Sequence, residues 1–269
     1  MQIKTIAITS PDNARFKFFK TLWDNHKRKK SGCFFAEGLK EISMAIREGF
    51  ELTDLFVSND QSEKAEGFMV ENNLLNVPLY LLSDNLLKTI MYREKTEGVT
   101  AVFKQKNLKL SEVKLNKSSL VIVLESVEKP GNLGAVIRTA DACNADAIIV
   151  CDPRTDIYNP NVIRSSVGCV FSKQVVVCSN QEAADWLILK KFQLITTLPE
   201  AKQNLYEIDY SKNVAVVFGT EADGLTDFWK MPETQPVRIP MLGVNDSLNV
   251  SVSVAVVCYE VLRRTQFEK

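Results

Sequence analysis

Five short runs of apolar residues in the second half of the chain restrict its fold more than any other feature. They are almost uninterrupted by polar residues and lie at 120–124, 147–151, 174–178, 193–197 and 214–218. A strand with one face in water alternates apolar and polar residues, whereas a strand buried on both faces is a continuous apolar run. Helix-compatible stretches separate the runs, so the sequence predicts a mostly parallel sheet covered by helices.

The first half of the chain predicts a smaller α/β domain. Apolar residues at helical intervals predict two helices, over 12–24 and 36–49, and the basic run 26–30 with Ser31-Gly32 predicts a loop between them. Strand-like segments follow at 55–57, 79–82 and 99–103. Short strands and helices in this order are typical of a small α/β domain.

A lysine-rich stretch separates the two halves and lacks large apolar clusters, as linkers between domains usually do. We therefore expect a small α/β domain at 1–105, a linker at 106–117 and a larger α/β domain at 118–269. Residues 1–117 carry 19 Lys and Arg against 15 Asp and Glu, whereas the remainder carries 14 against 18. The small basic surplus of the first half is compatible with a nucleic-acid partner.

The composition narrows the chemistry that this chain can perform. The six cysteines form no CxxC pair and lie mostly in apolar segments, where reduced thiols pack as small apolar groups. His26 is the only histidine, so we expect neither a metal site nor a histidine general base. No apolar run approaches the ~20 residues of a membrane span, and Met1–Thr5 lack the apolar core of a secretory signal. We therefore expect a cytoplasmic protein without membrane association.

Three segments, 130–140, 218–224 and 239–250, carry turn-forming or polar residues after runs of β-branched residues. In α/β proteins, ligands bind at the carboxyl ends of strands because free backbone amides and side chains converge there. We therefore expect the three segments to form one composite pocket. The first segment lacks the GxGxxG pattern of a dinucleotide site, which weakens an NAD-dependent oxidoreductase as an alternative.

The first two of these segments also have a simpler interpretation. In the first, Asn132 caps a helix and Arg138 pairs with Asp141 three residues later. In the second, Gly219 and Gly224 form a plain turn between a strand and a helix. Both interpretations remain open at the level of the single segment.

One stretch of the third segment is ambiguous in its secondary structure. Residues 249–254 alternate with period two, which is typical of a strand. Ser247 is a suitable helix N-cap, however, and Arg263 and Arg264 suit a helix C-terminus. We therefore predict a helix that begins after Ser247.

Together, the three segments resemble the motifs of a known family. NLGAVIRTA at 132–140, FGTEADGL at 218–225 and IPMLGVNDSLNVSVSVA at 239–255 are similar, in order and spacing, to the three motifs of the SpoU/TrmH family of RNA ribose 2′-O-methyltransferases, within the SPOUT superfamily. The resemblance covers residues 118–264, including 159–168. The first half more weakly resembles the family's small substrate-binding domain, which is similar to a ribosomal protein.

The resemblance implies an enzyme that transfers a methyl group from S-adenosyl-L-methionine (AdoMet) to a ribose 2′-hydroxyl of structured RNA. Ribosomal RNA is the first expected substrate and tRNA the second. The implied fold is α/β, a SPOUT-type parallel sheet with a C-terminal trefoil knot, preceded by the small α/β domain, and the implied assembly is a homodimer. A catalytically silent RNA-binding protein with the same fold is the alternative, although it would predict erosion of the catalytic positions.

The matched positions also imply the residues of the site. The implied catalytic residues are Asn132, Arg138, Glu221, Ser247 and Asn249, all of which are present. The implied cofactor-binding residues are Thr197, Leu198, Gly219, Gly224, Ile239, Met241, Leu248 and Asn249. We expect RNA contacts from Arg15, Lys27, Arg28, Lys29, Lys30, Arg138 and Arg164. The one departure from the family pattern is Glu128-Lys129 before Pro130, where many relatives carry an acidic residue next to the proline.

Overall fold

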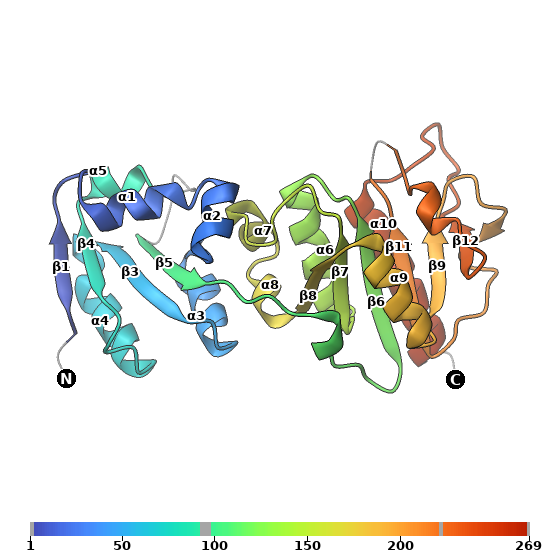
Figure 1. Ribbon diagram of the computed structural model, residues 1–269, viewed down its shortest axis with the longest axis horizontal. Helices are drawn as coiled ribbons and strands as arrows, with labels where there is room; N and C mark the ends of the chain where they lie inside the picture. The colour runs from blue at the N-terminus through green and yellow to red at the C-terminus, as the bar shows by residue number, and fades with distance from the viewer. Residues whose placement is uncertain (1–2, 92–97, 221–222, 268–269) are drawn as a thin grey trace. The chain divides into compact units, whose positions relative to one another are not determined.

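The structure is a computed structural model that describes residues 3–91, 98–220 and 223–267. The chain divides into two compact units, which contain different helices and strands (Figure 1). The first unit extends to Lys106 and also contains Tyr158–Arg164, while the second contains Asn107–Ile157 and the residues from Ser165 onward. A short piece of the second half of the sequence is therefore part of the first unit.

The first unit is built on a five-stranded mixed sheet. Its strands are β1 (Thr5–Ile8), β2 (Cys33–Glu37), β3 (Leu52–Ser58), β4 (Leu79–Leu82) and β5 (Val99–Lys104). They lie in the order β1-β4-β3-β5-β2, with parallel pairing among β1, β4 and β3 and antiparallel pairing of β5 with β3 and β2. The strands predicted at 55–57, 79–82 and 99–103 are confirmed as β3, β4 and β5, whereas β1 and β2 were not predicted.

The helices of the first unit are α1 (Ala14–Thr21), α2 (Asn25–Ser31), α3 (Leu39–Arg47), α4 (Ser62–Glu71) and α5 (Asp84–Lys88), with the 3-10 turn η1 (Asn59–Gln61). The helices predicted over 12–24 and 36–49 are confirmed as α1 and α3. The loop predicted for the basic run is wrong, because these residues form α2. The Asp24 side chain caps α2 by accepting a 2.9 Å hydrogen bond from the Lys27 amide, and Gly32 ends the helix at φ +64°.

Aromatic rings hold the first unit together. The ring of Phe19 on α1 lies 4.9 Å from that of Phe35 and 5.2 Å from that of Phe56, measured between centroids. Tyr158 stacks on Phe34 with centroids 4.5 Å apart, and its hydroxyl donates a 2.6 Å hydrogen bond to the carbonyl of Lys106. Ring stacking and this hydrogen bond therefore bind Tyr158 to the first unit.

The second unit is built on a seven-stranded sheet in which every described ladder is parallel. Its strands are β6 (Ser119–Glu125), β7 (Ala147–Cys151), β8 (Gln174–Cys178), β9 (Gln193–Thr197), β10 (Gln203–Asn204), β11 (Asn213–Phe218) and β12 (Thr234–Arg238). They lie in the order β10-β12-β9-β11-β6-β7-β8. All five predicted strands are confirmed, as β6, β7, β8, β9 and β11. The predicted α/β fold with a parallel sheet is thus confirmed for this unit.

Helices cover both faces of this sheet. The remaining helices of the chain are α6 (Pro130–Ala142), α7 (Pro160–Ser165), α8 (Cys169–Ser172), α9 (Asn180–Leu189) and α10 (Val250–Leu262), with the short turns η2 (Leu110–Glu112), η3 (Asp227–Trp229) and η4 (Arg263–Phe267). Helix α9 packs on one face, and α6 and α10 pack together on the other (Figure 1). Leu110, Val113 and Leu115, from the expected linker, pack against the core beneath α9.

The helix predicted after Ser247 is confirmed as α10, but its predicted cap is wrong. The N-cap is Asn249, whose side-chain oxygen accepts a 3.0 Å hydrogen bond from the Ser251 amide. Helix α6 begins at Pro130 with Lys129 as the N-cap, so Asn132 lies inside the first turn and does not cap the helix. In both helices the N-cap is a residue other than the predicted one, so neither Asn132 nor Ser247 acts as a helix cap.

Candidate functional site

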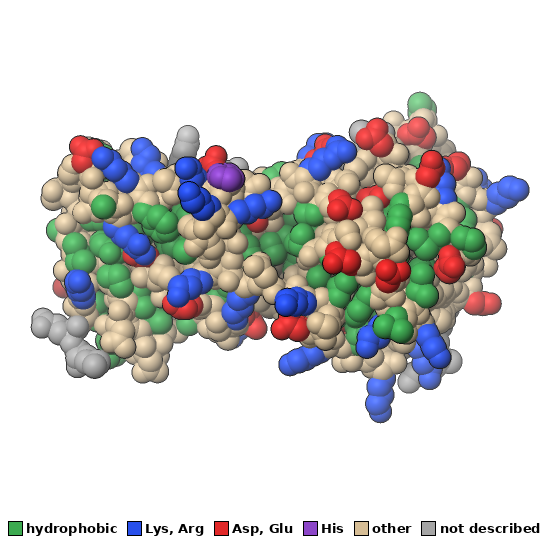
Figure 2. Space-filling model, viewed as in Figure 1, with side chains coloured by type: hydrophobic (Ala, Val, Ile, Leu, Met, Phe, Trp, Pro, Cys, Tyr) green, Lys and Arg blue, Asp and Glu red, His purple; other side chains and the backbone are tan. Residues whose placement is uncertain are grey.

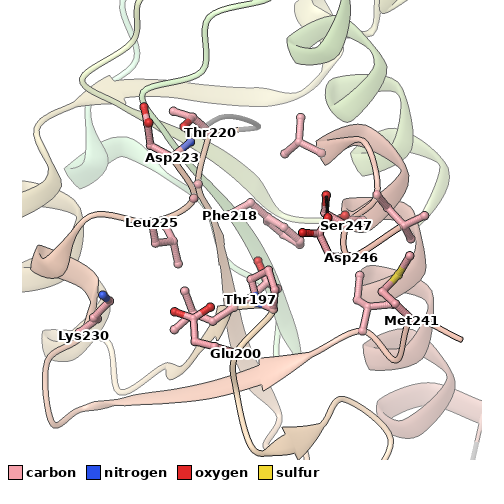
Figure 3. A pocket seen from close by; sticks show the side chains of 18 residues that line it. Thr197, Glu200, Phe218, Thr220, Asp223, Leu225, Lys230, Met241, Asp246 and Ser247 are labelled. Carbon is pink, nitrogen blue, oxygen red and sulfur yellow. Dashed lines mark hydrogen bonds between the residues drawn. The ribbon is translucent and has the colours of Figure 1, made fainter. Parts of the chain in front are cut away.

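A cavity of about 490 Å³ lies at the carboxyl ends of β9 and β11 (Figure 3). It is a position expected of a ligand site, because ligands of parallel α/β sheets bind outside the carboxyl ends of the strands. Its lining comes from the end of β9, from the loop after β11 and from the loop before α10. It includes Thr197, Leu198, Gly219, Gly224, Ile239, Met241, Ser247 and Leu248. The structure thus brings seven of the eight expected cofactor residues to one cavity; the eighth, Asn249, does not line it.

We call the loop after β11 the cofactor loop and define it as residues 219–225, of which the structure describes 219–220 and 223–225. Its described part folds back on itself at Gly219. A Cβ atom on Gly219 would lie only 2.1 Å from the carbonyl carbon and oxygen of Gly224. The amides of Thr220 and Gly224 each donate to the other's carbonyl, at 3.0 and 3.1 Å. Gly224 has φ +68°, but the space where its Cβ would point is open. The close approach of the backbone therefore depends on the missing side chain of Gly219.

The lining combines apolar surface with charged groups. Leu198, Ile239 and Leu248 supply apolar surface, and the carboxylates come from Glu200, Asp223 and Asp246. Such a set suits a ligand with an aromatic ring, hydroxyl groups and positive charge, and AdoMet has all three. Sequence reasoning missed these carboxylates, although Glu200 and Asp223 lie within a few residues of a predicted strand end.

Lys230 is the cation of the lining and was also missed. Its amino group forms an ion pair with Asp227 at 2.8 Å. The hydrogen bond with Asp227 raises the pKa of Lys230 and lowers the pKa of Asp227. Lys230 therefore stays positively charged at neutral pH.

Two of the expected catalytic residues lie next to this cavity. The Asn249 side-chain amide donates a 3.3 Å hydrogen bond to the side-chain oxygen of Asn132 and so links α10 to α6. Asn132 lines a second, smaller cavity of about 130 Å³ together with Lys129 and Val250. Gly219 lines both cavities, so the two are neighbours.

The other expected catalytic residues are placed differently. Ser247 lines the larger cavity, and its hydroxyl donates to Asp246 at 3.1 Å. Arg138 is exposed on α6 and lines neither cavity, and within the described chain no ion pair joins it to Asp141. Glu221 lies outside the described residues. The structure therefore groups Asn132, Ser247 and Asn249, whereas Arg138 is not among the lining residues of either cavity.

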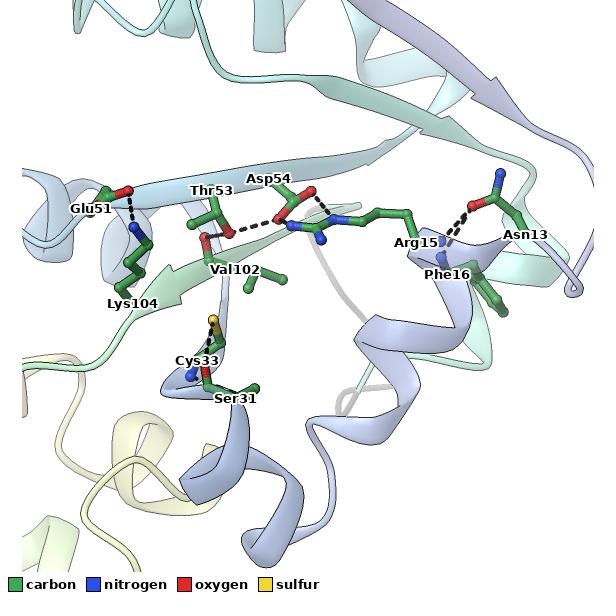
Figure 4. Close-up of polar contacts among 10 residues, drawn as sticks. All are labelled: Asn13, Arg15, Phe16, Ser31, Cys33, Glu51, Thr53, Asp54, Val102 and Lys104. Atoms are coloured by element: carbon green, nitrogen blue, oxygen red, sulfur yellow. Dashed lines mark hydrogen bonds and ion pairs between the residues drawn. The ribbon is translucent and has the colours of Figure 1, made fainter.

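Of the residues expected to contact RNA, Arg15 is engaged within the first unit (Figure 4). Its guanidinium donates to both carboxylate oxygens of buried Asp54, and Asp54 also accepts a 2.6 Å hydrogen bond from the Thr53 hydroxyl. The hydrogen bond with Asp54 raises the pKa of Arg15. A bidentate pair of this kind fixes the direction in which the guanidinium points.

The predicted RNA contact of Arg28 has to be corrected, because this residue is only 1% exposed. Its guanidinium donates to the carbonyls of Leu22 at 2.8 Å and Trp23 at 3.0 Å. Arg28 therefore stabilises the turn between α1 and α2 and is not available to an RNA phosphate. Sequence alone could not separate it from its basic neighbours.

The remaining expected RNA contacts are exposed. Lys27, Lys29 and Lys30 surround the buried Arg28 on α2, and Arg164 lies on α7. Figure 2 shows Lys and Arg side chains around the single histidine, which belongs to the same helix. No described carboxylate forms an ion pair with the three α2 lysines. They are thus open to an anionic partner.

Two searches across the described residues gave negative results. None of the helices there is long and apolar enough to cross a membrane. No group of three or more His, Cys, Asp or Glu side chains in that part of the chain is arranged to hold a metal ion.

Two family models match this chain. The model of the SpoU rRNA methylase family matches residues 119–259, which include all three motifs. The model of the MRM3-like substrate-binding domain matches residues 13–101. Both cavities are lined by residues inside the first of these ranges.

Similar proteins span nearly the whole chain. A 23S rRNA uridine 2′-O-methyltransferase of Streptomyces viridochromogenes is 27% identical over 94% of this chain and 90% of its own length. A 23S rRNA guanosine 2′-O-methyltransferase of Bacillus subtilis is 27% identical over 94% and 97%. The crystal structure of an AdoMet-bound rRNA methyltransferase from Sinorhizobium meliloti is similar with a TM-score of 0.87, 26% identity and coverage of 97% and 98%.

Proposed function

The chain belongs to the SpoU rRNA methylase family, and we propose that it transfers a methyl group from AdoMet to a ribose 2′-hydroxyl of ribosomal RNA. The observation that carries this proposal is the cavity at the carboxyl ends of β9 and β11, lined by residues of the second and third motifs. The names of the relatives from Streptomyces viridochromogenes and Bacillus subtilis give 23S rRNA as their substrate. Ribosomal RNA is thus the first choice and tRNA the second, in the cytoplasm.

The larger cavity supplies suitable groups for holding AdoMet. Leu198, Ile239 and Leu248 would pack against the adenine, and the carboxylates of Glu200 and Asp246 would accept hydrogen bonds from hydroxyl or ammonium groups. The backbone of Gly219, whose missing side chain lets the loop close on itself, would face the cofactor. AdoMet supplies an electrophilic methyl group on a sulfonium, so the protein has to orient the acceptor hydroxyl and favour its deprotonation.

The smaller cavity borders the larger one and would receive the acceptor ribose. Asn132, held by Asn249, would orient the ribose there. Arg138 would bind the adjacent phosphate, and its charge would lower the pKa of the ribose hydroxyl, with the proton leaving to that phosphate or to water. A guanidinium is always charged in proteins, so an electrostatic role is favoured over that of a general base.

We further infer a homodimer in which a second copy completes the site. Helix α10 exposes the apolar side chains of Val252 and Tyr259 next to the site, and Leu248 and Leu242 precede them on the same segment. Exposed apolar side chains grouped in this way are typical of protein interfaces. Such an assembly would also let the exposed Arg138 of one copy act at the cavity of the other.

Family membership also supports the finer features of the fold. We infer that the chain from β11 to α10 is threaded as a trefoil knot, and that residues 118–269, apart from the segment Tyr158–Arg164 of the first unit, form the methyltransferase domain. Residues 1–105, most of which match the substrate-binding model, would hold the RNA, with 106–117 as the connection.

The decisive experiment measures transfer of labelled methyl from AdoMet to size-fractionated cellular RNA and to unmodified 23S rRNA and tRNA transcripts. We expect label in ribosomal RNA at a ribose 2′-oxygen. Arg138→Ala should lose turnover at saturating RNA while AdoMet binding, measured by calorimetry, stays intact. Lys190→Ala, which removes an exposed cation outside both cavities, is the matched control and should retain turnover.

Two outcomes would contradict this proposal. Binding of AdoMet without label in any RNA would favour a silent RNA-binding protein. Normal turnover by Arg138→Ala would refute both the electrostatic and the general-base role of this residue.

A further inference from the structure

A carboxylate is buried at the carboxyl end of the central strand β6. It belongs to Glu125, which is 1% exposed. Its Oε1 accepts hydrogen bonds from the Asn180 side-chain amide at 2.7 Å and from the Thr226 hydroxyl at 2.6 Å, and its Oε2 accepts from the Thr226 backbone amide at 2.8 Å. All of these donors are neutral. A buried charge is costly, so one that is satisfied by several donors points to a specific role.

The partners of Glu125 are themselves fixed. Asn180 is the first residue of α9, and its side-chain oxygen accepts a 2.9 Å hydrogen bond from the indole nitrogen of Trp229. Trp229 ends the turn η3 and belongs to the core cluster beneath α9. The orientation of the Asn180 amide group is therefore set, with its nitrogen toward Glu125. The network joins β6, α9 and η3.

Thr226 is also the residue that directly follows the cofactor loop. The loop begins at Gly219, where the backbones of Gly219 and Gly224 meet, and it leaves through Leu225 into Thr226. Gly219, Gly224 and Leu225 line the larger cavity. One end of the loop is thus fixed by close backbone packing and the other by the hydrogen bonds from Thr226 to Glu125.

We propose that Glu125 is a positioning residue for AdoMet, which acts by holding Thr226 and, through it, the cofactor loop. This inference rests on the proposed function, because it assigns the larger cavity to AdoMet. Glu125 belongs to none of the three motifs. Its signal in the sequence is a charged residue at the end of an apolar run that is buried on both faces.

Glutamine has nearly the same shape as glutamate, but it cannot accept all of the hydrogen bonds that Glu125 accepts from Asn180 and Thr226. An amide nitrogen in place of Oε2 would face the Thr226 N–H, and in place of Oε1 it would face the Asn180 amide nitrogen. Either orientation sets two donors against each other and loses a hydrogen bond. The Asn180 amide cannot rotate to compensate without losing its hydrogen bond from Trp229. Glu125→Gln therefore disturbs the network with almost no change in volume.

The test measures the Kd of AdoMet by calorimetry, and kcat at saturating AdoMet, for full-length variants. Glu125→Gln should weaken AdoMet binding by about tenfold or more. Thr226→Val, which removes one of the three hydrogen bonds, should weaken binding by a smaller factor of about three to ten. Glu182→Gln is the matched control, since this exposed carboxylate only caps the start of α9, and it should leave the Kd unchanged.

The outcomes separate this inference from the proposed function. If wild type does not bind AdoMet, the proposed function fails. If wild type binds and Glu125→Gln binds equally well, or no worse than Glu182→Gln, the positioning role is refuted. A normal Kd with a lowered kcat would indicate that Glu125 acts on the acceptor ribose, and it would also refute the positioning role for AdoMet. If Glu125→Gln does not fold, Thr226→Val decides, because a Kd equal to that of wild type would exclude the hydrogen bond to Glu125 as a determinant of binding.

Discussion

The two glycines of the second motif differ in how well they should tolerate substitution. Gly219 and Gly224 belong to the same loop and line the same cavity, but only Gly219 packs against backbone. The backbone of Gly224 cannot move aside as a flexible side chain can, so a residue with a Cβ atom does not fit at position 219. The identity of Gly224 is favoured only by its positive φ.

This difference predicts unequal effects of the same substitution. Gly219→Ala places a Cβ 2.1 Å from Gly224, and we expect it to abolish measurable AdoMet binding in calorimetry. Gly224→Ala, the matched control, should cost about 1–2 kcal/mol in the free energy of unfolding and retain measurable AdoMet binding. Equal Kd values for the two variants would contradict the close packing of the loop.

Some site residues could be predicted from the sequence, whereas Arg28 and Glu125 could not. The cofactor residues were found because their motifs follow strand ends, a signal that is local in sequence. Arg28 and Lys29 look alike in the sequence, because both are basic residues of one polar run. Only the fold shows that the Arg28 guanidinium donates to the carbonyls of Leu22 and Trp23. Glu125 was missed because its donors, Asn180 on α9 and Thr226 just before η3, lie far away in the sequence.

At the scale of elements, buried strands were the most predictable part of the fold. The five apolar runs became β6, β7, β8, β9 and β11, because burial on both faces leaves a continuous apolar signature. Strand β12 contains Pro236 and polar residues, and it carries no such signature. Helix α2 was missed because its polar sequence has no apolar period, and only its caps, Asp24 and Gly32, mark it.

The N-cap of α10 provides a test at this scale. Asn249→Ala removes the acceptor for the Ser251 amide and should lower the free energy of unfolding by about 0.5–2 kcal/mol. Ser247→Ala removes a hydroxyl that caps nothing, and we expect a change within about 0.5 kcal/mol. Chemical denaturation of both variants gives the comparison. A larger loss of stability from Ser247→Ala than from Asn249→Ala would indicate that Ser247 is the N-cap, as the sequence predicted.

The lysines of α2 provide a second test. Lys29→Gln/Lys30→Gln should reduce the slope of log K against log salt for RNA binding by about 0.7–0.9 for each RNA phosphate that these lysines neutralise. The double variant Lys190→Gln/Lys191→Gln removes two exposed lysines of the second unit and should leave the slope unchanged. An unchanged slope for the α2 variant would exclude these lysines from the RNA interface.

At the scale of the whole molecule, the exposed apolar side chains of α10 bear on assembly. Val252 is 46% exposed on α10, and Val70 is 58% exposed on α4. Only Val252 has exposed apolar neighbours on the same helix and the loop before it. An isolated exposed valine needs no explanation, whereas a group of them does.

We expect the wild-type protein to sediment as a dimer in analytical ultracentrifugation. Val252→Asp should give monomers, because it places a charge in the proposed interface. Val70→Asp should remain dimeric. Dissociation by both variants, or by neither, would contradict an interface that includes α10.

The passage of Tyr158–Arg164 into the first unit affects how such proteins can be recombined. Two modules joined by one connection could be exchanged between relatives by a single crossover. Here the chain passes from one unit to the other three times, after Lys106, after Ile157 and after Arg164. A chimaera joined near residue 117 would inherit Tyr158 from one parent and its stacking partner Phe34 from the other. Exchange of the first unit would therefore have to carry both segments of chain together.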